Sequence, residues 1–237
     1  MEETINIFAA CMNGSVEVVQ QLIANGVDVN EPRFSTQCTP LHLASISGKR
    51  RVVKLLLRNG ANVDAEDTDG RTALHYSVVR ANVGTTKDLL KFKANVNAQA
   101  TDLKTPLALA AYKGCSEIVR MLIEYNADPD SFDAHGRRAL HDAVFAEHKE
   151  CVDILIRAGA SQICVQTAEN SLTALASAIF NRRASMTQFL ATHELVDVNE
   201  TFHFNDNHCA LTLAVSCSND ELPCVEALFF KEQHVAN

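Results

Sequence analysis

A six-residue pattern recurs along this chain of 237 residues at an almost constant interval. It is clearest at residues 39–44, which have the sequence Thr-Pro-Leu-His-Leu-Ala. Related hexapeptides, spaced 33 to 36 residues apart, begin at six further positions: Ile5, Thr72, Thr105, Arg138, Thr173 and Cys209. A period of this length predicts stacked supersecondary units, because each unit is too thin to bury its apolar side alone.

The residues at the start of each hexapeptide favour the beginning of a helix. Pro40 and Pro106 suit the first helical position, where a backbone donor has no partner in any case. The preceding threonine is a good helix cap, and its hydroxyl is also within reach of the ring of His42 or His75. We therefore expect these histidines to be structural.

A hexapeptide of this kind at this interval is similar to the repeat of the ankyrin family. The resemblance implies an all-α solenoid of about seven helix-turn-helix units, joined by β-turn or hairpin loops, in a single domain over residues 1–237. The implied units are residues 1–34, 35–67, 68–100, 101–133, 134–166, 167–204 and 205–237.

The second helix of each repeat is expected to end at a residue with left-handed backbone geometry. Glycine occupies this place at Gly60 and Gly159, and Asn126 tolerates it fairly well. Lys93 stands there in the third repeat, where the left-handed conformation should cost about 1 kcal/mol. The third repeat is therefore predicted to be a weak joint.

Composition excludes several classes of partner and site. The net charge of -8 and the lack of a Lys/Arg run argue against nucleic acid and anionic membranes, and no apolar run approaches the length of a membrane span. The eight cysteines lack a C-x-x-C pair, which argues against zinc or a disulfide framework and favours a reducing compartment, the cytosol or the nucleus. We expect a monomer without cofactor or metal.

A row of apolar residues lies two positions after the last residue of each hexapeptide, in the last turn of the first helix. Its members are Met12, Ile46, Val79, Tyr112, Phe145 and Phe180. In ankyrin-repeat proteins this position typically varies and faces partners, so the resemblance implies a partner-binding surface. The alternative is that these side chains pack locally under the neighbouring hairpins.

Cations stand beside this row. Arg80 and Lys113 are the next residues along the chain, and Arg71, Lys104, Arg137 and His135 are expected to come from nearby hairpins. A basic pocket beside an apolar row predicts an apolar and acidic partner segment. The alternative is that these charges pair with Asp69, Asp102 or Asp133.

Two further kinds of site are predicted outside the first helices. Phe202 and Phe204 lie in the longest hairpin insertion and are candidate contact residues. The spacing of Leu22, Asp28 and Asn30 resembles ankyrin hairpins modified by asparaginyl hydroxylases, which would make Asn30 a target; the alternative is ordinary turn chemistry.

No catalytic motif is present: the chain has no Gly-rich phosphate loop, no H-E-x-x-H and no nucleophile elbow. The predicted function is therefore protein binding through the concave face, as an inhibitor or scaffold. A resemblance to ankyrin-repeat proteins that carry a SOCS box implies, as an alternative, a substrate-recognition adaptor of a ubiquitin ligase. A third possibility is a purely structural repeat segment.

Overall fold

The computed structural model describes residues 6–165 and 171–197, and these residues form short paired helices with one small β-ribbon. The predicted all-α repeat fold is confirmed. The chain divides into two compact units, one containing the residues up to Ala110 with Arg120–Ala127, the other containing Ala111–Val119 and the residues from Asp128 onward. The predicted repeat at residues 205–237 lies outside the described residues, and the extent of the domain stays a prediction.

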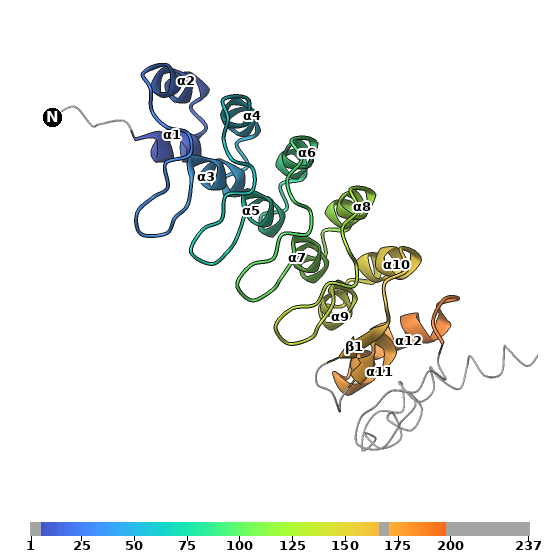
Figure 1. The fold of residues 1–237 in the computed structure, drawn as a ribbon. Coiled ribbons are helices and arrows are strands. Elements are labelled where there is room, and N and C mark those ends of the chain that lie inside the picture. The colour runs from blue at the N-terminus through green and yellow to red at the C-terminus, as the bar shows by residue number, and fades with distance from the viewer. Residues whose placement is uncertain (1–5, 166–170, 198–237) are drawn as a thin grey trace, which may run out of the picture. The chain divides into compact units, whose positions relative to one another are not determined.

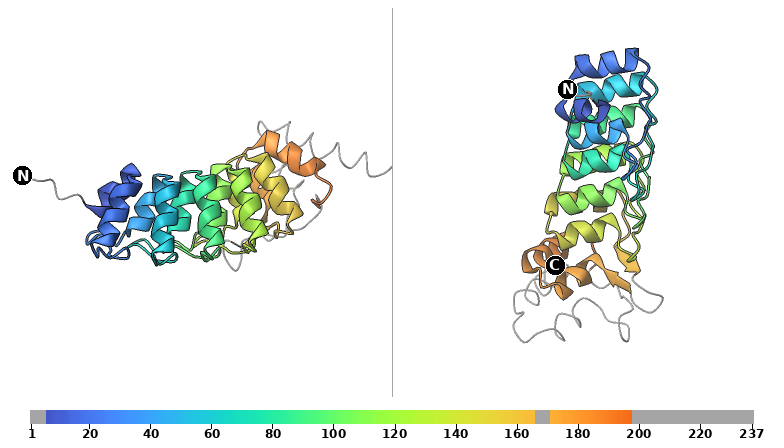
Figure 2. Two further views of the ribbon diagram at one scale, coloured as in Figure 1. Left: turned by 90° about the horizontal axis from the view of Figure 1, so that it is seen from above. Right: turned by 90° about the vertical axis from the view of Figure 1, so that its left-hand side faces the viewer.

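Six helices lie wholly within the first unit: α1 (Ile7–Asn13), α2 (Val16–Ala24), α3 (Pro40–Ile46), α4 (Arg50–Arg58), α5 (Ala73–Val79) and α6 (Val83–Lys91). The boundary between the units passes through α7 (Pro106–Lys113) and α8 (Ser116–Glu124). In the first unit, α1, α3 and α5 pack in one row and α2, α4 and α6 in a second (Figure 1). Figure 2 shows that the loops of this unit gather along one side of its helices.

The second unit contains α9 (Ala139–Phe145), α10 (Lys149–Arg157), β1 (Ile163–Val165), β2 (Ser171–Thr173), α11 (Ala174–Phe180) and α12 (Ala184–Thr192). The two strands are antiparallel, with Ile163 opposite Thr173. Helix α9 packs on α10 and α11, and α11 also packs on α12 and β2. The same pairing of a first and a second helix therefore continues in this unit.

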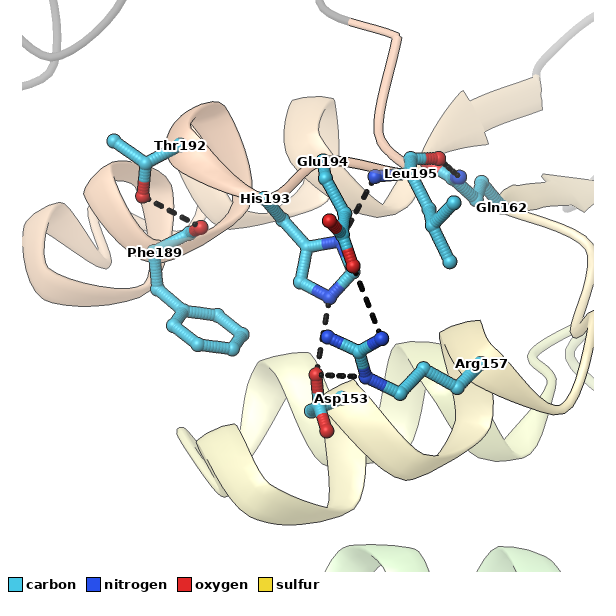
Figure 3. Close-up of polar contacts among 8 residues, drawn as sticks. All are labelled: Asp153, Arg157, Gln162, Phe189, Thr192, His193, Glu194 and Leu195. Carbon is cyan, nitrogen blue, oxygen red and sulfur yellow. Dashed lines mark hydrogen bonds and ion pairs between the residues drawn. The ribbon is translucent and has the colours of Figure 1, made fainter.

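A polar network joins the residues after α12 to α10 (Figure 3). The Nδ1 of His193 accepts from the backbone N–H of Leu195, so its Nε2 carries the proton and donates to Asp153 over 3.2 Å. Arg157 bonds to the same carboxylate at 2.9 Å and to Glu194 at 3.0 Å. The end of α12 is thus fixed to the preceding repeat by charged groups as well as by apolar packing.

The core of the first unit consists of slender aliphatic side chains supplied by both helix rows. Leu41 and Leu74 of the first helices and Leu56 and Leu89 of the second helices are almost completely buried. Full burial of such a side chain contributes about 2 kcal/mol. Because each layer is only one helix pair thick, small alanines between these residues let neighbouring repeats approach closely.

Two buried histidines of the hexapeptides, His42 and His75, each bond to two successive repeats. His42 Nδ1 lies 3.0 Å from the backbone N and 2.9 Å from the hydroxyl of Thr39, and its Nε2 lies 3.0 Å from the Arg71 carbonyl in the next repeat. His75 has the same contacts with Thr72 and with the Lys104 carbonyl. In both rings Nδ1 accepts from a backbone N–H and so has no proton, while Nε2 donates its proton to a carbonyl, so both rings are neutral. The predicted structural role of these histidines is confirmed.

Where alanine replaces the histidine, the threonine caps the helix directly. Thr105 Oγ1 accepts from the Ala108 N–H at 3.2 Å, and Thr173 Oγ1 accepts from the Ala176 N–H at 3.1 Å. These repeats keep the helix start but lack the histidine link to the carbonyl of the next repeat. The hexapeptide therefore has two versions with different consequences for how strongly repeats are joined.

The left-handed residues after the second helices occur where the sequence predicts them. Gly60 and Gly159 have φ of 85° and 81°, and Asn126 and Lys93 both have φ of 63°. A lysine in this conformation has a steric cost that glycine avoids.

Replacing Lys93 by glycine is expected to raise the free energy of unfolding by about 0.5–1 kcal/mol, because glycine adopts the left-handed conformation without strain. Urea denaturation measures this change. The matched control is Lys87→Gly inside α6, which should lower the free energy of unfolding by about 1 kcal/mol. A loss of stability in Lys93→Gly would contradict the assignment of strain.

Stability is expected to fall between pH 6.5 and pH 4. Burial lowers the pKa of His75 and of His141 to about 4, and it also lowers the pKa of His42. The unfolded chain takes up these protons first, so the histidines stabilise the fold fully above about pH 6.5 and lose that contribution as pH falls towards 4. His75 and His141 should each account for about 2 kcal/mol of loss at pH 5.

His75→Gln tests this assignment, because glutamine can still accept from Thr72 and donate to a carbonyl but does not titrate. Urea denaturation between pH 7 and pH 5 should show a shallower pH dependence in the variant than in the original chain. Equal slopes in the two proteins would contradict the burial of a neutral ring at His75.

Candidate protein-interaction surface

The predicted apolar row is accessible in both units. In the first unit, Met12 is 47% exposed, and Ile46 and Val79 are half-buried at the ends of α3 and α5. In the second unit, the exposed fractions of Tyr112, Phe145 and Phe180 are 42%, 42% and 51%. Three aromatic side chains in the last turns of α7, α9 and α11 therefore present about half of their surface to solvent.

The second unit has a pocket between two of these aromatic residues. It has a volume of about 190 Å³. Its walls are formed by Arg137, His141, Phe145, Leu172, Ser177, Phe180 and Asn181. The pocket therefore combines two aromatic rings and a leucine with a hydroxyl, an amide and a guanidinium group, a composition typical of a site for an apolar side chain with polar neighbours.

Local contacts hold the pocket walls in place. Asn181 Nδ2 donates to the Ser177 carbonyl at 2.8 Å, which fixes the amide at the end of α11. The Arg183 guanidinium lies 5.6 Å from the centre of the Phe145 ring and bonds to Glu147 at 2.8 Å. A cation at this distance is attracted to the aromatic ring. Phe145 is thereby contacted by a cation of the following repeat and also lines the pocket.

The predicted cation Arg137 lies at the pocket but is paired within its own hairpin. Its Nε and Nη2 donate to Asp133 at 3.1 and 2.9 Å, and its Nη1 lies 3.9 Å from Asp142. Burial alone would raise the pKa of Asp133, but the bonds from Arg137 and from the His135 backbone N–H outweigh it and lower that pKa. For Arg137, the alternative that the hairpin charges pair with nearby aspartates is therefore confirmed.

Arg80 and Lys113 are exposed at the ends of α5 and α7. Arg80 belongs to the first unit and Lys113 to the second, so each cation contributes to the surface of its own unit. His148 Nε2 lies 3.2 Å from the Tyr112 carbonyl. Because a carbonyl oxygen can only accept, His148 Nε2 is the donor. That bond orders the end of α7 next to Lys113.

The pocket contains one buried histidine that departs from the pattern of the others. His141 Nε2 lies 3.2 Å from the Gln162 carbonyl, as expected for a link to the next repeat. Within the part of the chain that the structure describes, its Nδ1 has no hydrogen-bond partner. Arg138 stands where four other hexapeptides have threonine, and it forms a β-bridge with Phe132. The sequence signal for this difference was the missing threonine.

Asn30 has a structural role in its hairpin. Its Oδ1 accepts from the Asn62 N–H at 2.7 Å, and its Nδ2 donates to the Gly60 carbonyl at 3.0 Å. Both side-chain atoms thus bind the next repeat, and hydroxylation of Asn30 stays a prediction. The candidate residues Phe202 and Phe204 lie outside the described residues.

Sequence reasoning identified the aromatic walls but missed Leu172 and Ser177. Ser177 precedes Phe180 by three residues, a spacing that places both on one helix face and could have indicated it. Leu172 comes from β2, and no sequence signal pointed to it. Among residues 6–165 and 171–197, no three His, Cys, Asp or Glu side chains cluster as metal ligands, and no helix is long and apolar enough to cross a membrane.

Comparison with known proteins gives the family. The family model for ankyrin repeats (3 copies) matches residues 7–100 and 79–166. The ankyrin repeat domain-containing protein SAT10 of Stachybotrys chartarum is 30% identical over 185 residues, which are 66% of this chain and 10% of that protein. The potassium channel AKT2/3 of Arabidopsis thaliana is 28% identical over 172 residues, 72% of this chain and 21% of the channel.

The putative palmitoyltransferase ZDHHC13 of Danio rerio is 32% identical over 154 residues, 64% of this chain and 24% of that protein. The chain thus spans no more than about a quarter of the length of these three relatives. The family model matches well over half of the chain, and the chain therefore belongs to the ankyrin-repeat family, whose repeats serve as protein-interaction domains.

Proposed function

We propose that this chain holds a partner protein on the exposed ends of its first helices, as an inhibitor or a scaffold, with the pocket of the second unit as the anchor point. The observation that carries the proposal is the pocket between Phe145 and Phe180, since both rings are about half exposed. Aromatic residues in well-formed pockets supply a large share of binding energy at protein interfaces.

The chemistry of the pocket supports an apolar anchor residue on the partner. Phe145, Phe180 and Leu172 provide apolar walls, and Ser177 and Asn181 can bond to the backbone of a bound segment. Because Arg137 is already paired with Asp133, it contributes less positive charge than the sequence predicts. Attraction of an acidic partner segment would therefore depend on Arg80 and Lys113, which are exposed.

The activities in the names of some relatives are not carried over to this chain. Palmitoyltransferase ZDHHC13 and potassium channel AKT2/3 are matched over 24% and 21% of their lengths. The part of this chain that the structure describes consists of repeats, a fold that is typically not catalytic. We propose a binding module without enzymatic activity, acting as a monomer in the cytosol or nucleus; the ubiquitin-ligase adaptor role stays an alternative prediction.

Removing the three aromatic side chains is expected to abolish partner capture. The variant Tyr112→Ala/Phe145→Ala/Phe180→Ala and the original chain are each used as bait in cell lysate, and captured proteins are quantified by mass spectrometry. Proteins bound through this surface should be depleted at least about tenfold from the variant. Each truncation should cost about 1 kcal/mol or less of stability, because the side chains are already half exposed.

The matched control removes three exposed apolar side chains from other positions, in the variant Leu103→Ala/Tyr125→Ala/Leu195→Ala. This control should capture the same proteins as the original chain. If the aromatic triple variant captures the same set at the same level, the proposed binding surface is wrong. Thermal melting of all three proteins separates loss of binding from loss of fold.

A further inference from the structure

We propose that the solvent-facing side of α4 and α6 is a second interaction surface, and that it binds an acidic segment of a partner polypeptide. The cationic residues that form this surface are Arg51, Lys54, Arg58, Lys87, Lys91 and Lys93, and we call it the α4–α6 basic surface. It lies in the row of second helices of the first unit, and α4 and α6 are neighbours in that row (Figure 1).

The two helices expose no carboxylate. Together they contain six Lys or Arg residues and one Asp, a net charge of +5 in a protein whose net charge is -8. The one acidic residue, Asp88, has a buried side chain that is hydrogen-bonded by Arg50 and lies 3.5 Å from Lys54. Burial alone would raise the pKa of Asp88, but the bond and charge of Arg50 and the charge of Lys54 outweigh it and keep the carboxyl ionised.

Helix geometry gathers the cations of each helix on one face, including Lys54, which also pairs with Asp88. Arg51, Lys54 and Arg58 follow the spacing of residues that share one face of a helix, and so do Lys87 and Lys91. Lys54 and Lys87 occupy equivalent places in successive repeats, 33 residues apart, as do Arg58 and Lys91. Packed helices lie about 10 Å apart, so the four side chains are neighbours both along and between the helices.

The cations of this surface repel one another, although Asp88 relieves the repulsion at Lys54. Like charges four residues apart on a helix repel, and both helices contain such a pair, Lys54 with Arg58 and Lys87 with Lys91. Arg58, Lys87 and Lys91 are exposed, which leaves them accessible to an anionic partner. A bound segment with carboxylates at matching intervals would turn this repulsion into attraction.

The surface fits an acidic peptide better than a nucleic acid. It is confined to two short helices on a protein of negative net charge, whereas specific DNA interfaces bury about 1,000–2,500 Å² of protein surface. Phe92, at the end of α6 between Lys91 and Lys93, is 38% exposed and can receive an apolar side chain of the bound segment. The expected ligand is therefore an extended stretch of Glu and Asp with one apolar residue.

Fluorescence anisotropy with the full chain tests this inference. The probe is a labelled peptide of about 12 residues, an extended length of about 40 Å, with alternating Glu and Asp around a central Leu. The affinity should fall steeply between about 50 and 200 mM salt. Arg58→Gln/Lys91→Gln should weaken binding about tenfold, since it removes two exposed cations of the surface.

The matched control, Arg33→Gln/Lys149→Gln, removes the same number of charges from exposed positions outside the surface and should bind the peptide as the original chain does. Equal loss in both variants would overturn the assignment. So would equal binding of a peptide in which Gln and Asn replace Glu and Asp. Tighter binding of a single-stranded DNA oligonucleotide or of phosphatidylserine vesicles through the same residues would overturn the peptide as ligand.

Discussion

The second and third repeats are each joined to the next repeat by a neutral histidine ring that bonds to both. His42 accepts at Nδ1 from its own helix start and donates from Nε2 to the Arg71 carbonyl of the next repeat, and His75 does the same one repeat later. A thin helix pair cannot bury its apolar side alone, so the neighbour must be held in register. The ring does this from a buried position, and burial in turn keeps it uncharged.

Fixed register within a unit determines which residues can act together. Because equivalent positions of successive repeats lie side by side, one substitution pattern repeated along the chain becomes a surface. In the first unit, α4 and α6 pack together, and Lys54 and Lys87, like Arg58 and Lys91, occupy equivalent places on them. In the second unit, the first helices place Phe145 and Phe180 in the walls of one pocket. The two proposed surfaces belong to different units and have no residue in common.

The sequence was sufficient for features that depend on local rules. The hexapeptide gave the repeat and the family, Pro40 and Pro106 marked helix starts, and Lys93 was placed in a left-handed conformation that the structure confirms. Features that depend on contacts between elements were not predictable. Periodicity predicted exposed aromatic residues at Phe145 and Phe180, but the pocket between them also needs Leu172 from a strand that no pattern indicated.

Charge pairing was the other part that the sequence left open, because pairing depends on hairpin geometry. Arg137 folds back on Asp133, whose carboxylate also accepts from the backbone of the same turn. The same pocket contains His141, whose Nδ1 lacks the threonine partner that satisfies His42 and His75. Departures from the repeat's own rules therefore coincide with the candidate anchor site. Local rules are most often broken where function requires it, which independently favours the second unit's pocket as a site of binding.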